Sequence, residues 1–297
     1  MDINQSEISE RNVAISVIMN IVITVSEIVG GLISGSLALI SDGFHNLSDA
    51  ISGILTLWTL KLSHKKHTER FTFGYKRAEI LSATLNASFL LVIIVFLLIE
   101  AYKRFFSPEP IKGSIMIWVA LIGLTANWIS VFLLHKSAKH NLNIRSEYLH
   151  LLSDALSSIG VVIGGLLIYF FKIYWVDPLV TILIACFIFK EGFNIIKETT
   201  AILMECAPEG VDLNQLKTDI ESIKHVKRLH HVHIWMLSDR QLLFEGHICI
   251  DDMLVSETKK ARKQIEKLLQ TKYGVSHTTI QLEYNEHKNM GLINKKC

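Results

Sequence analysis

Charged residues are scarce in this chain of 297 residues: Asp, Glu, Lys and Arg make up only 20% of it, and hydrophobic residues 50%. The mean hydropathy of +0.35 is too apolar for a soluble globular or a disordered chain, which indicates that lipid is part of the solvent. The net charge is only +2, so no broad basic surface for nucleic acid is expected. The same apolar composition excludes a disulfide scaffold, and the four cysteines form no C-x-x-C pair, which argues against a zinc knuckle and a thioredoxin-type motif. The sequence therefore predicts a protein of the lipid bilayer that binds no nucleic acid.

Long apolar segments fill the first two thirds of the chain. Each has roughly 20 residues, enough at ~1.5 Å per residue to cross a hydrocarbon core of ~30 Å. We expect a bundle of six transmembrane helices, over residues 12–33, 37–60, 78–99, 114–134, 147–171 and 178–196. Lys and Arg collect in the loops after the second and fourth spans, and short cytoplasmic loops retain such residues, although Lys103 and Arg104 run against this asymmetry. Both termini are therefore expected in the cytoplasm, and the protein in the plasma membrane.

A charged, soluble pattern replaces the apolar one after about residue 203. The expected elements are helices at 212–223 and 256–273 and strands at 226–236, 242–250 and 278–284. Ser256 is expected to cap the second helix and Gly274 to end it. This αββαβ order suits a small α+β sandwich of the metallochaperone-like kind. The expected domains are a cytosolic tail at 1–11, a transmembrane transport domain at 12–203 and a cytosolic domain at 204–297.

One polar pattern occurs twice inside the apolar part of the chain. The sequence H-x-L-S-D-A begins at His45 in the second span and at His150 in the fifth. A spacing of four residues places Asp49 beside His45, and Asp154 beside His150, on one helix face. Two such helices facing each other would bring together two imidazoles and two carboxylates, a ligand set that tetrahedral Zn(II) accepts. Ionisable groups at membrane depth cost at least ~2.5 kcal/mol per aspartate, so they usually face the bundle interior and serve a function there.

A purely structural role is the alternative for this motif. Each His-Asp pair could be a local hydrogen bond that holds two helices together. The duplication of the pair at membrane depth favours the metal site instead. Asp42 and Glu147 each lie one turn before a motif histidine and could extend an ion path. Because both are near the end of a span, we expect them to be solvated mouth residues rather than ligands.

These features together resemble the cation diffusion facilitator family. The resemblance rests on the paired motifs, on the segment FGYKRAE at residues 73–79, on Asp177-Pro178 at the start of the sixth span, and on the cytosolic sandwich. It is greatest to the bacterial zinc, cobalt and cadmium resistance exporters. It implies a homodimer that exports a divalent metal from the cytosol in exchange for protons by alternating access. The transport site implied by the resemblance consists of His45, Asp49, His150 and Asp154.

Zinc is the expected substrate, with cadmium and cobalt as further candidates. Imidazole nitrogen favours these metals, whereas an all-oxygen site would suit the harder Mn(II). The protein is expected to be a secondary active transporter and not an enzyme, with no cofactor. A membrane metalloprotease would need a motif such as H-E-x-x-H and an open position for water, and the sequence contains no such motif. The alternative function is a membrane metal sensor without transport activity, which would need no duplicated site in the membrane.

A second group of histidines lies in the expected cytosolic domain. By resemblance, His230, His247 and Glu283 match a cytosolic metal site at which relatives sense or dock metal, which makes zinc a regulatory ligand as well as the substrate. The match is incomplete, because Lys260 and Gln281 stand where the family's binuclear version has histidines. We therefore expect one weak site at most.

The alternative for these histidines is that they are polar residues on a strand face. Strand alternation places His231 and His233 on one face of the first strand and His230 on the other. The sequence therefore leaves open which of the three histidines binds metal.

Overall fold

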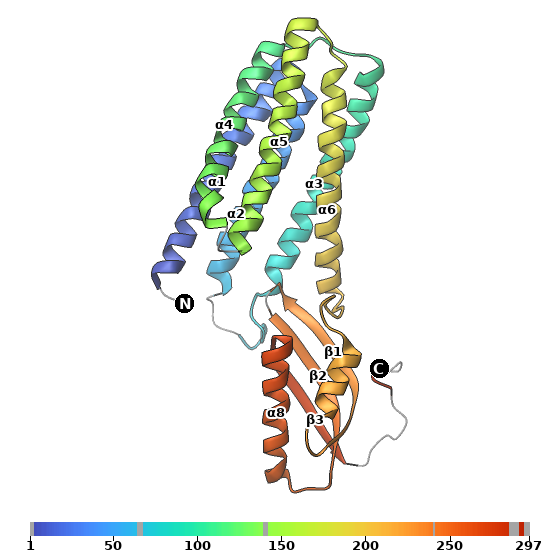
Figure 1. Cartoon of the computed structure of the whole chain (residues 1–297). Helices are drawn as coiled ribbons and strands as arrows, with labels where there is room; N and C mark the ends of the chain where they lie inside the picture. Colours follow the sequence, from blue (N-terminus) through green and yellow to red (C-terminus); the bar gives the residue numbers. More distant parts are fainter. Residues whose placement is uncertain (1–2, 64–67, 139–141, 240, 285–290, 294–297) are drawn as a thin grey trace. The chain divides into compact units, whose positions relative to one another are not determined.

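The computed structural model divides the chain into two compact units (Figure 1). The first unit comprises Met1–Gly74 and Leu81–Lys197, and the second comprises Tyr75–Ile80 and Glu198–Cys297. The structure describes residues 3–63, 68–138, 142–239, 241–284 and 291–293. The first unit is helical, whereas the second contains a sheet.

Long helices form the first unit. Their bounds are Ile3–Ser34 for α1, Leu37–Ser63 for α2, Arg77–Phe106 for α3, Gly113–Ala138 for α4, Leu142–Phe171 for α5 and Val176–Leu203 for α6. Each of the apolar segments expected to span the membrane falls inside one of these helices. The helices extend beyond their segments at both ends, except α2 at its start and α5 at its end. Pro178 lies in the first turn of α6, where its missing N–H leaves no intrahelical bond unmade.

Three of the helices are long and apolar enough in their described residues to cross a membrane, at Arg77–Phe106, His150–Phe171 and Val176–Leu203. Two shorter apolar segments occur at Asn20–Ser34 and Gly113–Ile129. The polar residues of the motif lower the hydropathy of α2. The expected count of six spans therefore stays a prediction.

Close packing of helix pairs brings α2 and α5 together in the middle of the first unit. Helix α1 packs along α2, α4 packs along α5, and α2 contacts α5 (Figure 1). Gly31 and Gly43 allow the first pair to approach: a Cβ atom at Gly31 would lie 2.6 Å from Ile40 Cγ1, and one at Gly43 would lie 2.8 Å from Ile28 Cγ1. Such small residues are common where membrane helices pack closely.

A carboxylate of α6 caps the start of α2. Ser36 Oγ accepts a hydrogen bond from Leu39 N at 3.2 Å, as an N-cap serine does. The same hydroxyl donates to Asp177 Oδ1 at 2.5 Å, and Asp177 Oδ2 accepts from Leu37 N at 2.8 Å. Asp177 is completely buried. The carboxylate thus satisfies backbone donors at the start of the helix that carries His45 and Asp49.

We expect Asp177→Ala to destabilise the first unit by about 1–2 kcal/mol, because the first turn of α2 loses its buried acceptor. Asp177→Asn keeps one side-chain oxygen and is expected to lose less. Thermal unfolding of the protein in detergent, followed by tryptophan fluorescence, measures the difference. Equal unfolding temperatures for wild type and Asp177→Ala would contradict this role of the cap.

A three-stranded sheet with two helices forms the second unit. Its elements are α7 (Leu213–Glu221), β1 (Val226–Ser238), β2 (Gln241–Ile250), α8 (Val255–Tyr273) and β3 (Val275–Tyr284). The strand order is β1-β2-β3, with β1 and β2 antiparallel and β2 and β3 parallel. The elements follow the expected αββαβ order.

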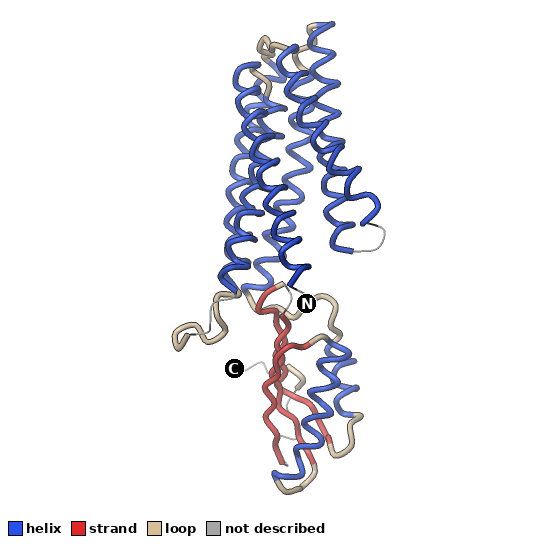
Figure 2. The backbone as a smooth tube through the Cα atoms, turned by 90° about the vertical axis from the view of Figure 1, so that its left-hand side faces the viewer, coloured by secondary structure: helices blue, strands red, loops and turns tan. Residues whose placement is uncertain are grey.

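The two helices cover one face of the sheet (Figure 2). Leu216 and Ile220 of α7 pack in one core with Ile265 of α8 and with Phe244 and Ile248 of β2. Because side chains alternate along a strand, the odd-numbered residues of β2 face away from this core.

A carboxylate joins the two helices of this unit. Asp219 of α7 accepts hydrogen bonds from Lys272 Nζ and, at 2.5 Å, from Tyr273 Oη of α8. The Lys272 ammonium group, with the Tyr273 hydroxyl, lowers the pKa of Asp219 to about 2. The carboxylate therefore stays charged in any neutral or mildly acidic medium.

Several boundaries of the second unit differ from expectation. Helix α7 spans Leu213–Glu221 rather than 212–223, with Asp212 as its N-cap. Helix α8 begins at Val255 rather than at Ser256, its N-cap is Leu254, and Glu257 Oε2 accepts a hydrogen bond from Leu254 N at 3.3 Å. Strand β3 begins at Val275, directly after Gly274, whose φ of 70° ends α8 as expected. Strand β1 continues to Ser238, which pairs with Gln241, so that the turn is shorter than expected. Arg240 of this turn lies outside the described residues.

Candidate metal-transport centre

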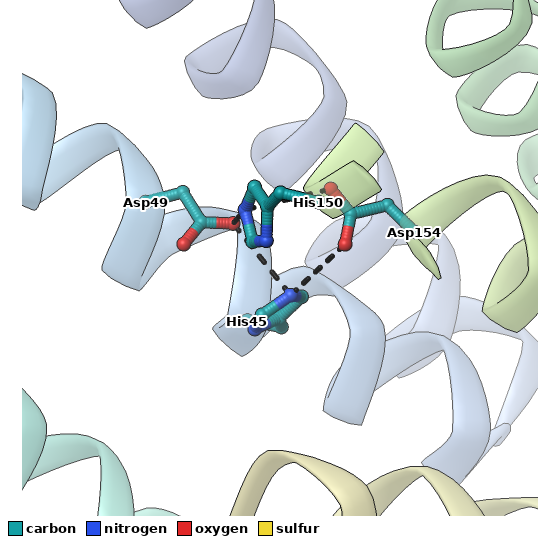
Figure 3. Close-up of side chains that lie close together, drawn as sticks. All are labelled: His45, Asp49, His150 and Asp154. Carbon is teal, nitrogen blue, oxygen red and sulfur yellow. Dashed lines mark hydrogen bonds and ion pairs between the residues drawn. The ribbon is translucent and has the colours of Figure 1, made fainter. Parts of the chain in front are cut away.

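The two copies of the motif meet in the first unit. His45 and Asp49 lie on α2 and His150 and Asp154 lie on α5, and their side chains point toward one another (Figure 3). His45 Nε2 lies 3.1 Å from Asp154 Oδ1 and 3.7 Å from Asp49 Oδ2. His150 Nε2 lies 3.4 Å from Asp49 Oδ2 and 3.7 Å from Asp154 Oδ2. Each histidine therefore contacts the aspartate of its own helix and that of the other helix.

This arrangement fits a tetrahedral divalent metal. One ligand atom from each of the four residues lies within 4.8 Å of all the others. With metal–ligand distances of ~2.0–2.1 Å, the donor atoms of a tetrahedral zinc lie about 3.4 Å apart, close to the separations found here. Asp49 Oδ2 is buried and makes no hydrogen bond of normal geometry within the described residues. A metal ion would give this oxygen a partner.

Burial differs among the four residues. His45 is only 7% exposed and Asp154 5%, whereas Asp49 and His150 are partly exposed. Both aspartates are acceptors and the two imidazoles supply one nitrogen each, so the set carries two formal negative charges when the histidines are neutral. A divalent cation would neutralise that charge in a site where an unpaired charge is costly.

Asp42 differs from the solvated mouth residue that the sequence suggested. It is only 3% exposed, and its carboxylate accepts hydrogen bonds from Ser157 Oγ at 2.6 Å and from Ser158 Oγ at 3.3 Å. The expectation of a solvated side chain is wrong, because α5 packs over this turn of α2. Asp42 is also outside the metal-competent cluster, as expected. The side chain of Glu147 lies outside the described residues.

A cavity of about 350 Å³ adjoins the cluster. His45 and Asp154 contribute to its wall, together with Ser153, Ser157 and Gly160 of α5. The wall formed by α6 is apolar and consists of Val180, Leu183, Ile184, Phe187 and Ile188. A Cβ atom at Gly160 would meet nothing within 4 Å, so this glycine leaves room beside the cluster. The cavity extends from the metal-competent residues along α5 and α6.

A second cluster lies in the second unit, on the face of the sheet away from α7 and α8. Glu283 Oε1 lies 2.6 Å from His247 Nδ1, and Glu283 Oε2 lies 3.2 Å from His230 Nε2. His230 pairs with His247 across β1 and β2, and it is completely buried. These three residues also offer ligand atoms within 4.8 Å of one another. The structure thus brings together the three residues that the resemblance implied.

The expected alternation of β1 is wrong at its histidines. A bulge lies between His230 and His233, and His231 has a φ of 49°. The bulge inserts one residue and turns His231 toward the side on which His230 and His233 already lie. The His231 ring consequently stacks on that of His247, with centroids 4.6 Å apart.

One neighbour of the second cluster, Cys249, was not predicted from the sequence. Cys249 Sγ lies 3.9 Å from His230 Nδ1, on the ring atom away from Glu283. Cys249 occurs two residues after His247 on β2, and that i, i+2 spacing could have placed it on the same face.

Comparisons with known proteins identify the family of this chain. Residues 13–204 match the family described as "Cation efflux transmembrane domain", and residues 208–285 match "Cation efflux protein, cytoplasmic domain". The chain is 37% identical to the cadmium, cobalt and zinc/H(+)-K(+) antiporter of Bacillus subtilis (strain 168), over 96% of this chain and 93% of that protein. It is 35% identical to the zinc transporter ZitB of Yersinia pestis, over 88% and 83%. It is 33% identical to the metal cation efflux system protein CzcD of Cupriavidus metallidurans (strain CH34 / ATCC 43123), over 93% and 87%.

The chain therefore belongs to the cation efflux family, whose members are the cation diffusion facilitators, as its motifs indicated. Proteins of this family are embedded in the membrane and move metal ions rather than catalyse a reaction.

Proposed function

We propose that this protein exports zinc from the cytosol in exchange for protons, with His45, Asp49, His150 and Asp154 as its transport site. Divalent-metal efflux follows from its family and its relatives. The finer assignment rests above all on one observation: two motifs 105 residues apart in sequence place four metal-ligating atoms within 4.8 Å of one another.

The ligand types support zinc, cadmium or cobalt as the cargo. Two imidazole nitrogens and two carboxylate oxygens suit these metals, whereas Mn(II) and Mg(II) prefer oxygen ligands alone. The names of the relatives agree, because they are described as transporters of zinc or of cadmium, cobalt and zinc. No enzyme activity is proposed, and the metal is cargo rather than a cofactor.

Proton exchange follows from ligand chemistry. A histidine binds metal only in its neutral form, so a metal ion and a proton compete for the same nitrogen. Zinc that enters from the cytosol displaces protons, and a more acidic outer compartment restores them and weakens the site. The name of the Bacillus subtilis relative, an H(+)-K(+) antiporter, supports this coupling. Alternating access then requires movement of helices around the site rather than a continuous pore.

The proposal also covers the oligomeric state, the location and the domain division of the protein. We infer a homodimer in the plasma membrane, with both termini in the cytoplasm and the division into residues 1–11, 12–203 and 204–297 given above. The cationic loops after α2 and α4 support this orientation. The match of residues 208–285 to a cytoplasmic domain supports the position of the second unit.

We assign a regulatory role to His230, His247 and Glu283, as a weak site that senses cytosolic zinc. His230→Ala is expected to raise the zinc concentration that gives half-maximal flux by about 10-fold, because one of three ligands is lost. The maximal flux is expected to stay unchanged, because the transport site is intact. Zinc titration of the transport rate in proteoliposomes measures both values.

His233→Ala is the matched control for this variant, since His233 lies on the same sheet face but outside the cluster. It is expected to behave as wild type. A complete loss of flux in His230→Ala, equal to that of an Asp49 or Asp154 variant, would defeat the division between a transport site and a regulatory site.

The experiment that tests the proposed function measures two fluxes at once. Purified protein is placed in liposomes, zinc is added outside, and zinc-sensitive and pH-sensitive dyes are trapped inside. Opposed zinc and proton fluxes that depend on the imposed pH gradient are expected. Zinc binding without flux would instead favour a membrane metal sensor.

A further inference from the structure

A buried carboxyl group lies outside the metal cluster, on α1. Glu27 is only 1% exposed, and the metal-competent cluster does not include it. Three further buried polar residues belong to the same region of the helix bundle: Thr24 on α1, Asn46 on α2 and Asn127 on α4. Thr24 precedes Glu27 by three residues and thus shares its helix face.

The two carboxylate oxygens of Glu27 have different surroundings. Glu27 Oε2 accepts a hydrogen bond from Asn46 Nδ2 at 2.7 Å. Glu27 Oε1 faces α4 so closely that a Cβ atom at Gly123 would lie 2.6 Å from it. Within the described part of the chain, Oε1 has no hydrogen-bond partner.

Two other polar atoms of this region are also buried without a hydrogen-bond partner among the described residues, namely Thr24 Oγ1 and Asn127 Nδ2. Asn127 follows Gly123 by four residues on α4 and therefore lies on the face that meets Glu27. Buried polar atoms are nearly always paired, so a group of orphaned atoms indicates a binding site for a small polar species.

No cation neutralises Glu27 in the described residues: none of the ion pairs there includes it. The titratable groups that face it are Asp42 and His45 from α2 and Asp154 from α5. Residues 113–129 of α4, which include Gly123 and Asn127, carry no titratable side chain. A carboxylate buried at membrane depth beside another carboxylate, without an ion pair to a cation, is costly unless it takes up a proton.

We propose that Glu27 is a proton-binding group of the transport cycle, separate from the four metal ligands, in a buried polar region that also contains Thr24 and Asn127. This inference rests on the proposed exchange of zinc for protons. In the metal-free site Glu27 holds a proton on one carboxylate oxygen. Arrival of the dication near His45 favours the ionised carboxylate, so the proton leaves to water, and after the metal has left the carboxylate takes up a proton again.

Asn46 gives this coupling a short physical route. It follows His45 in the sequence and donates its hydrogen bond to Glu27. A metal bound by His45 thus lies one residue away from the group that holds the Glu27 carboxylate. When Glu27 loses its proton, the positive charge of the incoming metal partly offsets the new negative charge. Such charge compensation is what an exchange of metal for protons requires.

The test counts the protons released when zinc binds. Isothermal titration of the full-length protein with zinc, in buffers of different ionisation enthalpy, gives this number directly. Glu27→Gln keeps an oxygen that can accept from Asn46 but cannot titrate, and we expect it to release one proton fewer per zinc ion than wild type. The dependence of zinc affinity on pH becomes shallower by the same amount, following proton linkage. Glu27→Asp keeps a carboxyl group and is expected to restore the proton count.

A second measurement uses wild type alone, in case Glu27→Gln does not fold. With glutamate labelled by ¹³C, infrared difference spectra are expected to show loss of a protonated glutamate carboxyl band when zinc is added. An unchanged proton count in Glu27→Gln, or the absence of that band change, would overturn the inference. Failure of the proposed function is distinguishable, because wild-type zinc flux would then occur without any opposed proton flux.

Discussion

Asp154→Asn is expected to abolish zinc transport while the fold stays intact. The carboxylate is 5% exposed and lies 3.1 Å from His45 Nε2, so its charge acts from a buried position in direct contact with another ligand. The neutral amide leaves one formal negative charge to hold a dication. Loss even of an outer-shell partner costs 10–100-fold in metal affinity, so loss of a ligand charge is expected to weaken zinc binding by more than about 100-fold.

Zinc flux into proteoliposomes and calorimetric zinc binding measure this loss, with gel filtration in detergent to check the fold. Asp49→Asn is expected to give the same result. Asp251→Asn is the matched control, because Asp251 is an exposed carboxylate of the cytosolic unit that pairs with His225 and Lys227. Wild-type flux in Asp154→Asn would show that the cluster is not the transport site.

The double variant His45→Asp, His150→Asp is expected to shift the metal preference of the site from zinc toward manganese. It turns a set of two nitrogens and two oxygens into four carboxylates, which suit harder metals such as Mn(II). Zinc affinity is expected to fall by more than about 100-fold, since both imidazole ligands are lost, while Mn(II) binding rises relative to zinc.

Competition between zinc and manganese for binding and for flux measures this change. His277→Asp, at an exposed position of β3, makes the same substitution away from either cluster and is expected to keep zinc preference. Unchanged preference for zinc in the double variant would mean that selectivity arises elsewhere, for example at the cytosolic cluster.

The centre of the site could be predicted because helix geometry is regular. A spacing of four residues places His45 above Asp49 whatever the helix packs against, and the same holds for His150 and Asp154. The approach of α2 to α5 followed only from the duplication of the motif. The structure adds the cross-helix distances, which a single sequence does not contain.

The burial of two acidic side chains depends on tertiary packing and could not be predicted from the sequence. Asp42 was expected to be solvated because it lies near a span end, but Ser157 and Ser158 of α5 cover it. Glu27 carried no motif at all, and its burial depends on the close approach of α4 at Gly123. In both cases the decisive partner lies on another helix, far away in the sequence.

In the cytosolic sheet, the order of the elements could be predicted from the sequence but the local strand geometry could not. The order of helices and strands followed from periodicity, and Gly274 ended α8 as expected. The sheet faces on which the histidines lie could not be predicted in this way. Simple alternation assumes a regular strand, whereas His231 occupies a bulge with positive φ. A bulge residue other than glycine leaves no clear mark in one sequence.

The central claim is that His45, Asp49, His150 and Asp154 together hold the metal that is transported. X-ray absorption spectroscopy of zinc-loaded protein tests it most directly, in a His230→Ala, His247→Ala background that removes the cytosolic cluster. One zinc ion per chain is expected, with four nitrogen and oxygen neighbours at ~2.0–2.1 Å, two of them imidazole, and this zinc is expected to be lost in Asp154→Asn. Sulfur neighbours at ~2.3 Å, or the same spectrum in the Asp154→Asn variant, would contradict it.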